Sequence, residues 1–110
     1  MLSSENIDKL RTLLTQAIDQ HLAKGGKIIS GRFSTGFNEE YCPVSCLVGD
    51  DHLISRTSRI ATKLGAPFSG DDMWALIDGF DQRLQGPHEN SELYKLGQEL
   101  RAKYLPVVKP

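Results

Sequence analysis

Apolar residues near the start of the chain recur at the spacing of an α-helix. They come every three or four positions with polar residues between them, and the set comprises Ile7, Leu10, Leu14, Ala17, Ile18 and Leu22. Ser3 or Ser4 can accept a hydrogen bond from the free N–H groups of a first turn. Glycines at positions 25 and 26 supply the left-handed backbone that commonly ends a helix. The pattern predicts a helix over about residues 4–24.

The helical period breaks down over residues 27–49. The segment 27–30 fits either a short strand or an extended connector. Pro43 fits the first position of a short helix, because its missing N–H is not needed there. The alternative is a hairpin in which residues 44–48 pair with residues 52–55. We favour the short helix.

A further helix is predicted over about residues 51–64. Its buried side would carry Leu53, Ile60 and Leu64. Gly65 follows the last of these and fits the residue just beyond a helix end.

The next helical pattern begins with Ser69 and Asp72, which resemble a capping box. The usual residue at the second position is Glu or Gln. The stripe expected to face inward comprises Met73, Leu76, Ile77, Phe80 and Leu84. This helix is expected to end before the Gly-Pro pair at positions 86 and 87.

The last helical pattern opens at Asn90 or Ser91, and Pro106 stops it. Its inward stripe comprises Leu93, Leu96, Gly97, Leu100 and Tyr104. Glycine inside a helix costs about 1 kcal/mol relative to alanine, so each such glycine needs a reason. Close packing of another backbone is the reason we expect at Gly97.

These patterns together predict a mainly α fold. We expect a single domain over residues 1–110, built as a compact bundle of about four helices with a short irregular or extended insert near residues 27–49. The first helix and the last two should supply most of the core. A small α+β arrangement is the alternative, if residues 27–30 or 44–55 form strands.

The composition is that of a globular protein, and its charge is nearly balanced. The hydrophobic fraction of 39% and charged fraction of 25% argue against disorder. The formal net charge is −1, which gives no overall field toward nucleic acid or anionic lipid. The first residues lack the basic flank and apolar run of a secretory signal, and no stretch approaches the ~20 apolar residues of a membrane span. We therefore expect a cytoplasmic protein with no membrane contact.

The two cysteines form the most visible motif. Cys42 and Cys46 would lie one turn apart if helical, and His52 follows six residues later. Two thiolates and an imidazole could gather around zinc, although no fourth ligand is evident and the spacing matches no common zinc module. Three residues separate the cysteines, whereas thioredoxin-type motifs have two. We expect buried, unreactive thiols and no cofactor, and keep zinc as the alternative.

A basic stripe raises the question of DNA binding. Arg56, Arg59 and Lys63 share one helical face, as in a helix-turn-helix that contacts phosphates. The next helix carries four aspartates before its first basic residue, which would repel DNA. We therefore do not expect nucleic acid to be a partner.

The sequence contains no recognisable catalytic signature. It has neither a phosphate-binding loop nor a Gly-x-Ser-x-Gly elbow. Asp78 and Asp81 lie one turn apart and could act as acid and base, but nothing marks either as perturbed. An enzyme built on them is the weakest of our hypotheses.

The leading hypothesis is a small non-catalytic protein-interaction or regulatory domain. The segment from residue 33 to residue 41 combines aromatic residues with glycine, and such loops often form contact surfaces. The residues predicted to bind a protein partner are Arg32, Phe33, Phe37 and Tyr41. A homodimer would also hide spare apolar surface, for which residues 105–108 are a candidate.

Overall fold

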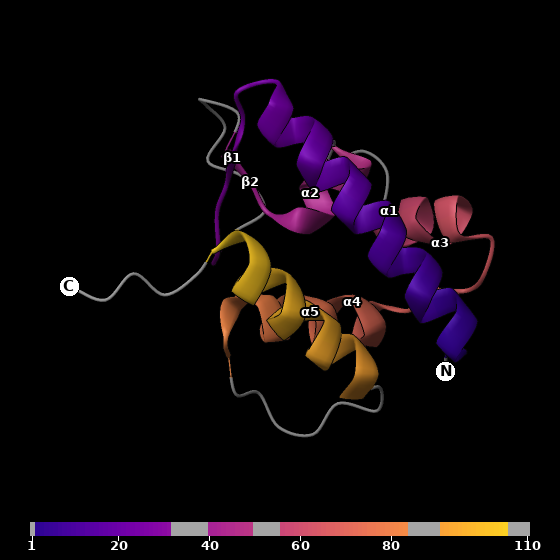
Figure 1. Cartoon of the computed structure of the whole chain (residues 1–110). Helices are drawn as coiled ribbons and strands as arrows, with labels where there is room; N and C mark the ends of the chain where they lie inside the picture. Colours follow the sequence, from indigo (N-terminus) through magenta and orange to yellow (C-terminus); the bar gives the residue numbers. More distant parts are fainter. Residues whose placement is uncertain (1, 32–39, 50–55, 84–90, 106–110) are drawn as a thin grey trace.

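The described part of the chain folds into five helices and one pair of very short strands. The computed structural model describes residues 2–31, 40–49, 56–83 and 91–105 (Figure 1). In chain order the elements are α1 (Ser4–Ala23), β1 (Lys27–Ile28), β2 (Glu40–Tyr41), α2 (Pro43–Val48), α3 (Arg56–Leu64), α4 (Gly70–Asp81) and α5 (Ser91–Tyr104). The predicted mainly α fold with a short insert is confirmed.

The helices form two groups that share one core. In Figure 1, α1 lies with α2 and α3, while α4 and α5 run side by side beneath them. The strands β1 and β2 pair in parallel, with Lys27 opposite Glu40 and Ile28 opposite Tyr41. The side chains buried most completely include Leu10, Leu14, Ile18, Val44, Ile60, Leu64, Leu76, Leu93, Leu96 and Leu100. None of the described helices has both the length and the apolar character needed to cross a membrane.

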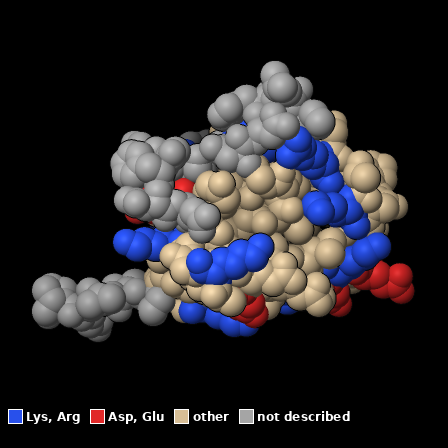
Figure 2. Space-filling view, turned by 90° about the horizontal axis from the view of Figure 1, so that it is seen from above, with Lys and Arg blue, Asp and Glu red and all other residues tan. Residues whose placement is uncertain are grey.

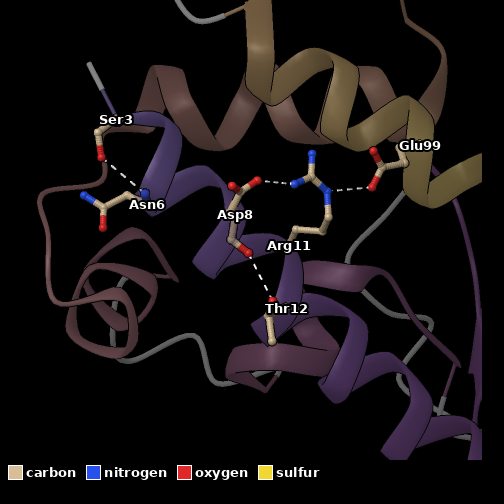
Figure 3. Close-up of polar contacts among 6 residues, drawn as sticks. All are labelled: Ser3, Asn6, Asp8, Arg11, Thr12 and Glu99. Carbon is tan, nitrogen blue, oxygen red and sulfur yellow. Dashed lines mark hydrogen bonds and ion pairs between the residues drawn. The ribbon is translucent and has the colours of Figure 1, made fainter.

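The first helix follows its prediction almost residue for residue. Ser3 is the N-cap, and its hydroxyl accepts a hydrogen bond from the N–H of Asn6 at 3.2 Å (Figure 3). At the other end, Lys24 is the C-cap and Gly25 has a positive φ of 88°. The predicted apolar stripe is buried at Ile7, Leu10, Leu14 and Ile18, but Leu22 is 41% exposed.

The insert contains the short helix rather than the alternative hairpin. Pro43 occupies the start of α2, where it removes no hydrogen bond, and the N–H of Gly49 donates to Ser45 O at 2.7 Å at its end. Residues 44–48 are therefore helical, and the hairpin alternative for them is wrong. Segment 27–30 contributes only the two-residue strand β1. Of the helix predicted over 51–64, residues 51–55 lie outside the described residues and the rest forms α3.

Helix α4 begins as predicted but ends earlier. Both bonds of the capping box are present: Ser69 Oγ accepts from the N–H of Asp72, and Asp72 Oδ2 accepts from the N–H of Ser69, each at 3.0 Å. An aspartate thus serves where Glu or Gln is usual. The helix ends before the Gly-Pro pair as predicted, but it stops at Asp81 and so does not extend to Leu84, because Gln82 turns into the left-handed region at φ 59°. The predicted inward position of Leu84 lies outside the described residues.

Two glycines allow α4 and α5 to touch backbone to backbone. A Cβ at Gly79 would come within 2.1 Å of Tyr94 O, and a Cβ at Gly97 within 2.2 Å of Leu76 O. Real Cβ contacts are never that short, so alanine at either position requires the helices to move apart. The expected packing role of Gly97 is confirmed, and Gly79 has the same role.

Polar contacts hold α1 to α5 at the surface. Figure 3 shows Arg11 between Asp8 on its own helix and Glu99 on α5. The Arg11 Nε–H donates to Glu99 Oε2 at 2.7 Å. Nearer the C-terminal ends of both helices, the hydroxyl of Tyr104 donates to Asp19 Oδ1 at 2.8 Å. These bonds orient α1 across the pair formed by α4 and α5.

We expect Gly97→Ala to lower the free energy of unfolding by about 2 kcal/mol. Alanine gains about 1 kcal/mol of helix propensity over glycine, but forcing the helices apart costs more, since overpacking costs about 1–3 kcal/mol even where side chains can adjust and here the clash is with backbone. Gly70→Ala is the matched control, because a Cβ there meets nothing within 4 Å and should be neutral or stabilising. Urea unfolding followed by circular dichroism measures both. Equal effects of the two substitutions would contradict the close contact.

Candidate functional site

A pocket of about 190 Å³ lies where the start of α2 faces α4. Its walls come from three separate stretches of chain and from one residue of α5. The lining residues are Gly31, Cys42, Pro43, Val44, Trp74, Leu76, Ile77, Phe80, Asp81, Arg83 and Leu100. Most of these are apolar, so the pocket offers a surface suited to an apolar group of a ligand or partner.

The polar end of the pocket is built around Asp81, the last residue of α4. Its side chain is only 6% exposed. Oδ1 accepts two hydrogen bonds, from the hydroxyl of Ser30 and from the N–H of Gly31, each at 2.9 Å. Oδ2 lies 3.8 Å from a guanidinium nitrogen of Arg83, which also donates to Gly31 O at 3.2 Å. Asp81 therefore ties the segment after β1 to the end of α4.

Arg101 of α5 binds two groups next to Asp81. Its Nη1 donates to Ser30 Oγ at 3.0 Å and to Phe80 O at 2.8 Å. The Ser30 hydroxyl therefore accepts from Arg101 while it donates to Asp81. A carboxylate held by several donors in this way keeps a fixed orientation at the pocket.

Trp74 forms the exposed rim of the pocket. It is 46% exposed, and together with Leu22 it is one of the two large hydrophobic residues found exposed among the described residues. Trp74 lies outside the inward stripe of α4, whose predicted members Leu76, Ile77 and Phe80 are buried. A large aromatic residue that stands off a helix's buried stripe is a sequence signal for a surface contact, and our sequence interpretation did not use it.

The cysteines are buried or half-buried free thiols. Cys42 caps α2 and Cys46 lies one turn into it. Burial raises the pKa of the Cys42 thiol. Burial, and secondarily the neighbouring Cys42, raises the pKa of Cys46 to about 12. A raised pKa keeps both sulfurs protonated at neutral pH, the opposite of what a reactive or metal-binding thiol needs.

The zinc alternative cannot be assembled from the described residues. No three side chains among the described His, Cys, Asp and Glu come together in a way that could hold a metal ion. The third predicted ligand, His52, lies outside the described residues. The zinc hypothesis therefore stays a prediction.

Of the predicted partner-binding residues only Tyr41 is described. Arg32, Phe33 and Phe37 lie outside the described residues. The Tyr41 ring stacks on His21, with centroids 4.9 Å apart and planes 13° apart. Both rings border a second, more polar cavity of about 240 Å³ between α1 and α2, which Cys46 also lines. Tyr41 is thus half-buried against α1.

Of the charged residues singled out from the sequence, Asp81 lines the pocket, whereas Asp78 and the described residues of the basic stripe do not. On α3, an Nη1–H of Arg59 donates to Val48 O, so this residue of the basic stripe binds the end of α2. On the face shown in Figure 2, Lys and Arg side chains (blue) surround an uncharged area (tan), and several of them lie close together along one side of it. Asp78 is fully buried within α4, whereas Asp81 lines the pocket. The two aspartates of the enzyme hypothesis are therefore not presented to one common site.

We compared the chain with protein families, curated proteins and solved structures. No protein-family model, no curated protein and no solved structure matches the chain.

We expect the native thiols to react slowly with alkylating reagents at neutral pH. With a pKa of about 12, about one Cys46 side chain in 10⁵ is a thiolate at pH 7, against a few per cent for an unperturbed cysteine. The rate should rise as the pH is raised toward that pKa. Alkylation in urea serves as the unfolded reference and should be at least about a hundredfold faster. Rapid labelling of the folded protein would contradict the buried-thiol interpretation and favour a thiol or metal site.

Proposed function

We propose that the protein is a non-catalytic interaction domain, and that the pocket beside Trp74 is where it contacts a protein partner. The observation that carries the proposal is the combination of an apolar pocket with an exposed tryptophan at its rim. Tryptophan is among the residues that contribute most binding energy at protein interfaces, and such residues cluster around well-packed pockets.

The surroundings of the pocket fit this role. Binding energy at interfaces comes mainly from a few anchor side chains that enter preformed pockets. Here most of the walls belong to helices α2, α4 and α5, and the polar end is fixed by the hydrogen bonds among Asp81, Ser30 and Arg101. Little ordering is then needed when a partner binds, which lowers the entropic cost of association.

The polar groups near the pocket have structural tasks that suit a binding surface. Asp81 accepts from Ser30 and from the backbone of Gly31, and Arg83 donates to Gly31 O. A general base or nucleophile must instead reach a substrate atom with its reactive oxygen or nitrogen. The pocket's chemistry is therefore that of recognition.

Photo-crosslinking tests this function directly. A photoreactive aromatic residue placed at position 74 should give one dominant crosslinked protein product in cells, because that side chain lies at the proposed contact. The matched control carries the same residue at position 22, where Leu22 is comparably exposed on α1. Mass spectrometry identifies the products. Equal crosslinking from both positions, or none from position 74, would overturn the proposed contact.

A further inference from the structure

The pocket has room for one apolar side chain of a partner. Engineered apolar cavities of about 150 Å³ hold a benzene molecule. At about 190 Å³, this pocket can therefore take a ring the size of a phenylalanine side chain. Its walls include the side chains of Val44, Ile77 and Phe80, which favour an apolar group over a polar group of the same size.

Arg83 presents unused hydrogen-bond donors at the polar end of the same pocket. Its side chain is 40% exposed. Within the described part of the chain, its guanidinium contacts Gly31 O and Asp81 Oδ2, and both contacts are made by Nη2. A guanidinium carries five N–H donors, so those on Nε and Nη1 remain for a ligand. Their planar arrangement matches a carboxylate, which accepts two parallel hydrogen bonds.

The charges at this end favour an anion over a cation. Asp81 supplies one negative charge, and its Oδ1 already accepts two hydrogen bonds. Arg83 supplies one positive charge, and Arg101 adds a second close by, because it binds the Ser30 hydroxyl that donates to Asp81. The carbonyl groups at the end of α4 add partial negative charge, which Arg101 counters at Phe80 O. A ligand carboxylate balances the positive charge that remains.

The apolar walls and Arg83 line one small pocket, so the two groups that they bind must be close together. Successive side chains of an extended segment point to opposite faces. An acidic residue next to the apolar one would therefore point away from the pocket. The last residue of a chain instead carries its side chain and its carboxylate on the same Cα. Capture of a free C-terminal carboxylate is a recurring mode of peptide recognition.

We infer that the partner is anchored by its C-terminus, with an apolar last side chain in the pocket and the terminal carboxylate on Arg83. Trp74, at the rim, then contacts the residues that precede the anchor. This inference rests on the proposed function and names the chemistry of the partner. One anchor residue binds weakly, so we expect a short peptide to have a dissociation constant between about 0.1 and 1 mM.

A pair of short peptides tests the carboxylate. One is N-acetyl-Ser-Gly-Phe with a free C-terminus, and the other is the same peptide as its C-terminal amide. In NMR titrations of the intact protein, the free acid should shift the amide signals of Ile77 and Asp81, and it should change the fluorescence of Trp74, the only tryptophan. The acid should bind about tenfold more tightly than the amide, because it adds a hydrogen-bonded charge pair. Equal affinities would overturn the inference.

Arg83→Gln tests which residue binds the carboxylate. The substitution removes the positive charge and keeps an N–H donor, so the variant should bind the acid about tenfold more weakly and no longer prefer it to the amide. Lys63→Gln is the matched control, because Lys63 is exposed on α3 and does not line the pocket. It should bind both peptides as the wild type does. An unchanged preference in Arg83→Gln would overturn the assignment. If that variant fails to fold, the wild-type comparison of acid and amide remains decisive.

A peptide with an internal acidic residue distinguishes the two sources of a carboxylate. N-acetyl-Gly-Phe-Glu-Gly-amide carries an acid next to the apolar residue but has no free C-terminus. It should bind no more tightly than the amide of the first peptide. Binding as tight as that of the free acid would overturn the C-terminal anchor.

The outcomes separate this inference from the proposed function. If acid and amide bind equally at the pocket, the C-terminal anchor is overturned and the interaction pocket stands. If neither peptide binds but photo-crosslinking from position 74 gives its one product, the anchor is again overturned and the function stands. If peptide binding and crosslinking both fail, both are overturned.

Discussion

The backbone contact between α4 and α5 is the constraint on which the rest of the structure depends. Gly79 and Gly97 lie in it, and neither position can carry a Cβ at the observed separation. The contact fixes which side of α4 is turned toward α5 and leaves Trp74 on the outside of the fold. It also brings Arg101 close enough to bind Phe80 O and Ser30. The shape of the pocket is therefore set by two residues that do not line it.

Asp81 connects the pair of helices α4 and α5 to the other walls of the pocket. It ends α4, and the bonds from Ser30 and Gly31 attach the segment after β1 at that point. The start of α2 reaches the same pocket because β2 pairs with β1 and is followed directly by α2. The pocket thus forms where three distant stretches of sequence converge. The largely buried carboxylate of Asp81, whose Oδ1 accepts two hydrogen bonds and whose Oδ2 faces Arg83, gives the pocket a polar end.

Local patterns predicted the helices well and the pocket poorly. The stripe from Ile7 to Ile18 and the Ser69–Asp72 cap are short-range features, so the sequence located α1 and the start of α4. The end of α4 was not predicted because Gln82 adopts a left-handed backbone. Residues other than glycine rarely adopt this conformation, so a glutamine gives no sequence signal for it. The pocket joins Gly31, α2 and α4 through tertiary packing, which periodicity along one helix does not encode. Among the residues that line the pocket, Trp74 could have been singled out from the sequence, because a large aromatic residue outside the apolar stripe of a helix indicates a surface contact.

The polar contacts between α1 and α5 have a consequence for how the chain assembles during synthesis. Arg11 and Glu99 are 88 positions apart, and Asp19 and Tyr104 are 85 apart. Helix α2 follows soon after α1 and packs against it, so that part of the α1 surface is covered early. The α4–α5 pair, close in sequence, closes with a small loop entropy once α5 has left the ribosome. Helix α1 can bind Glu99 and Tyr104 only after α5 has been made, whereas α2 is available to it much sooner.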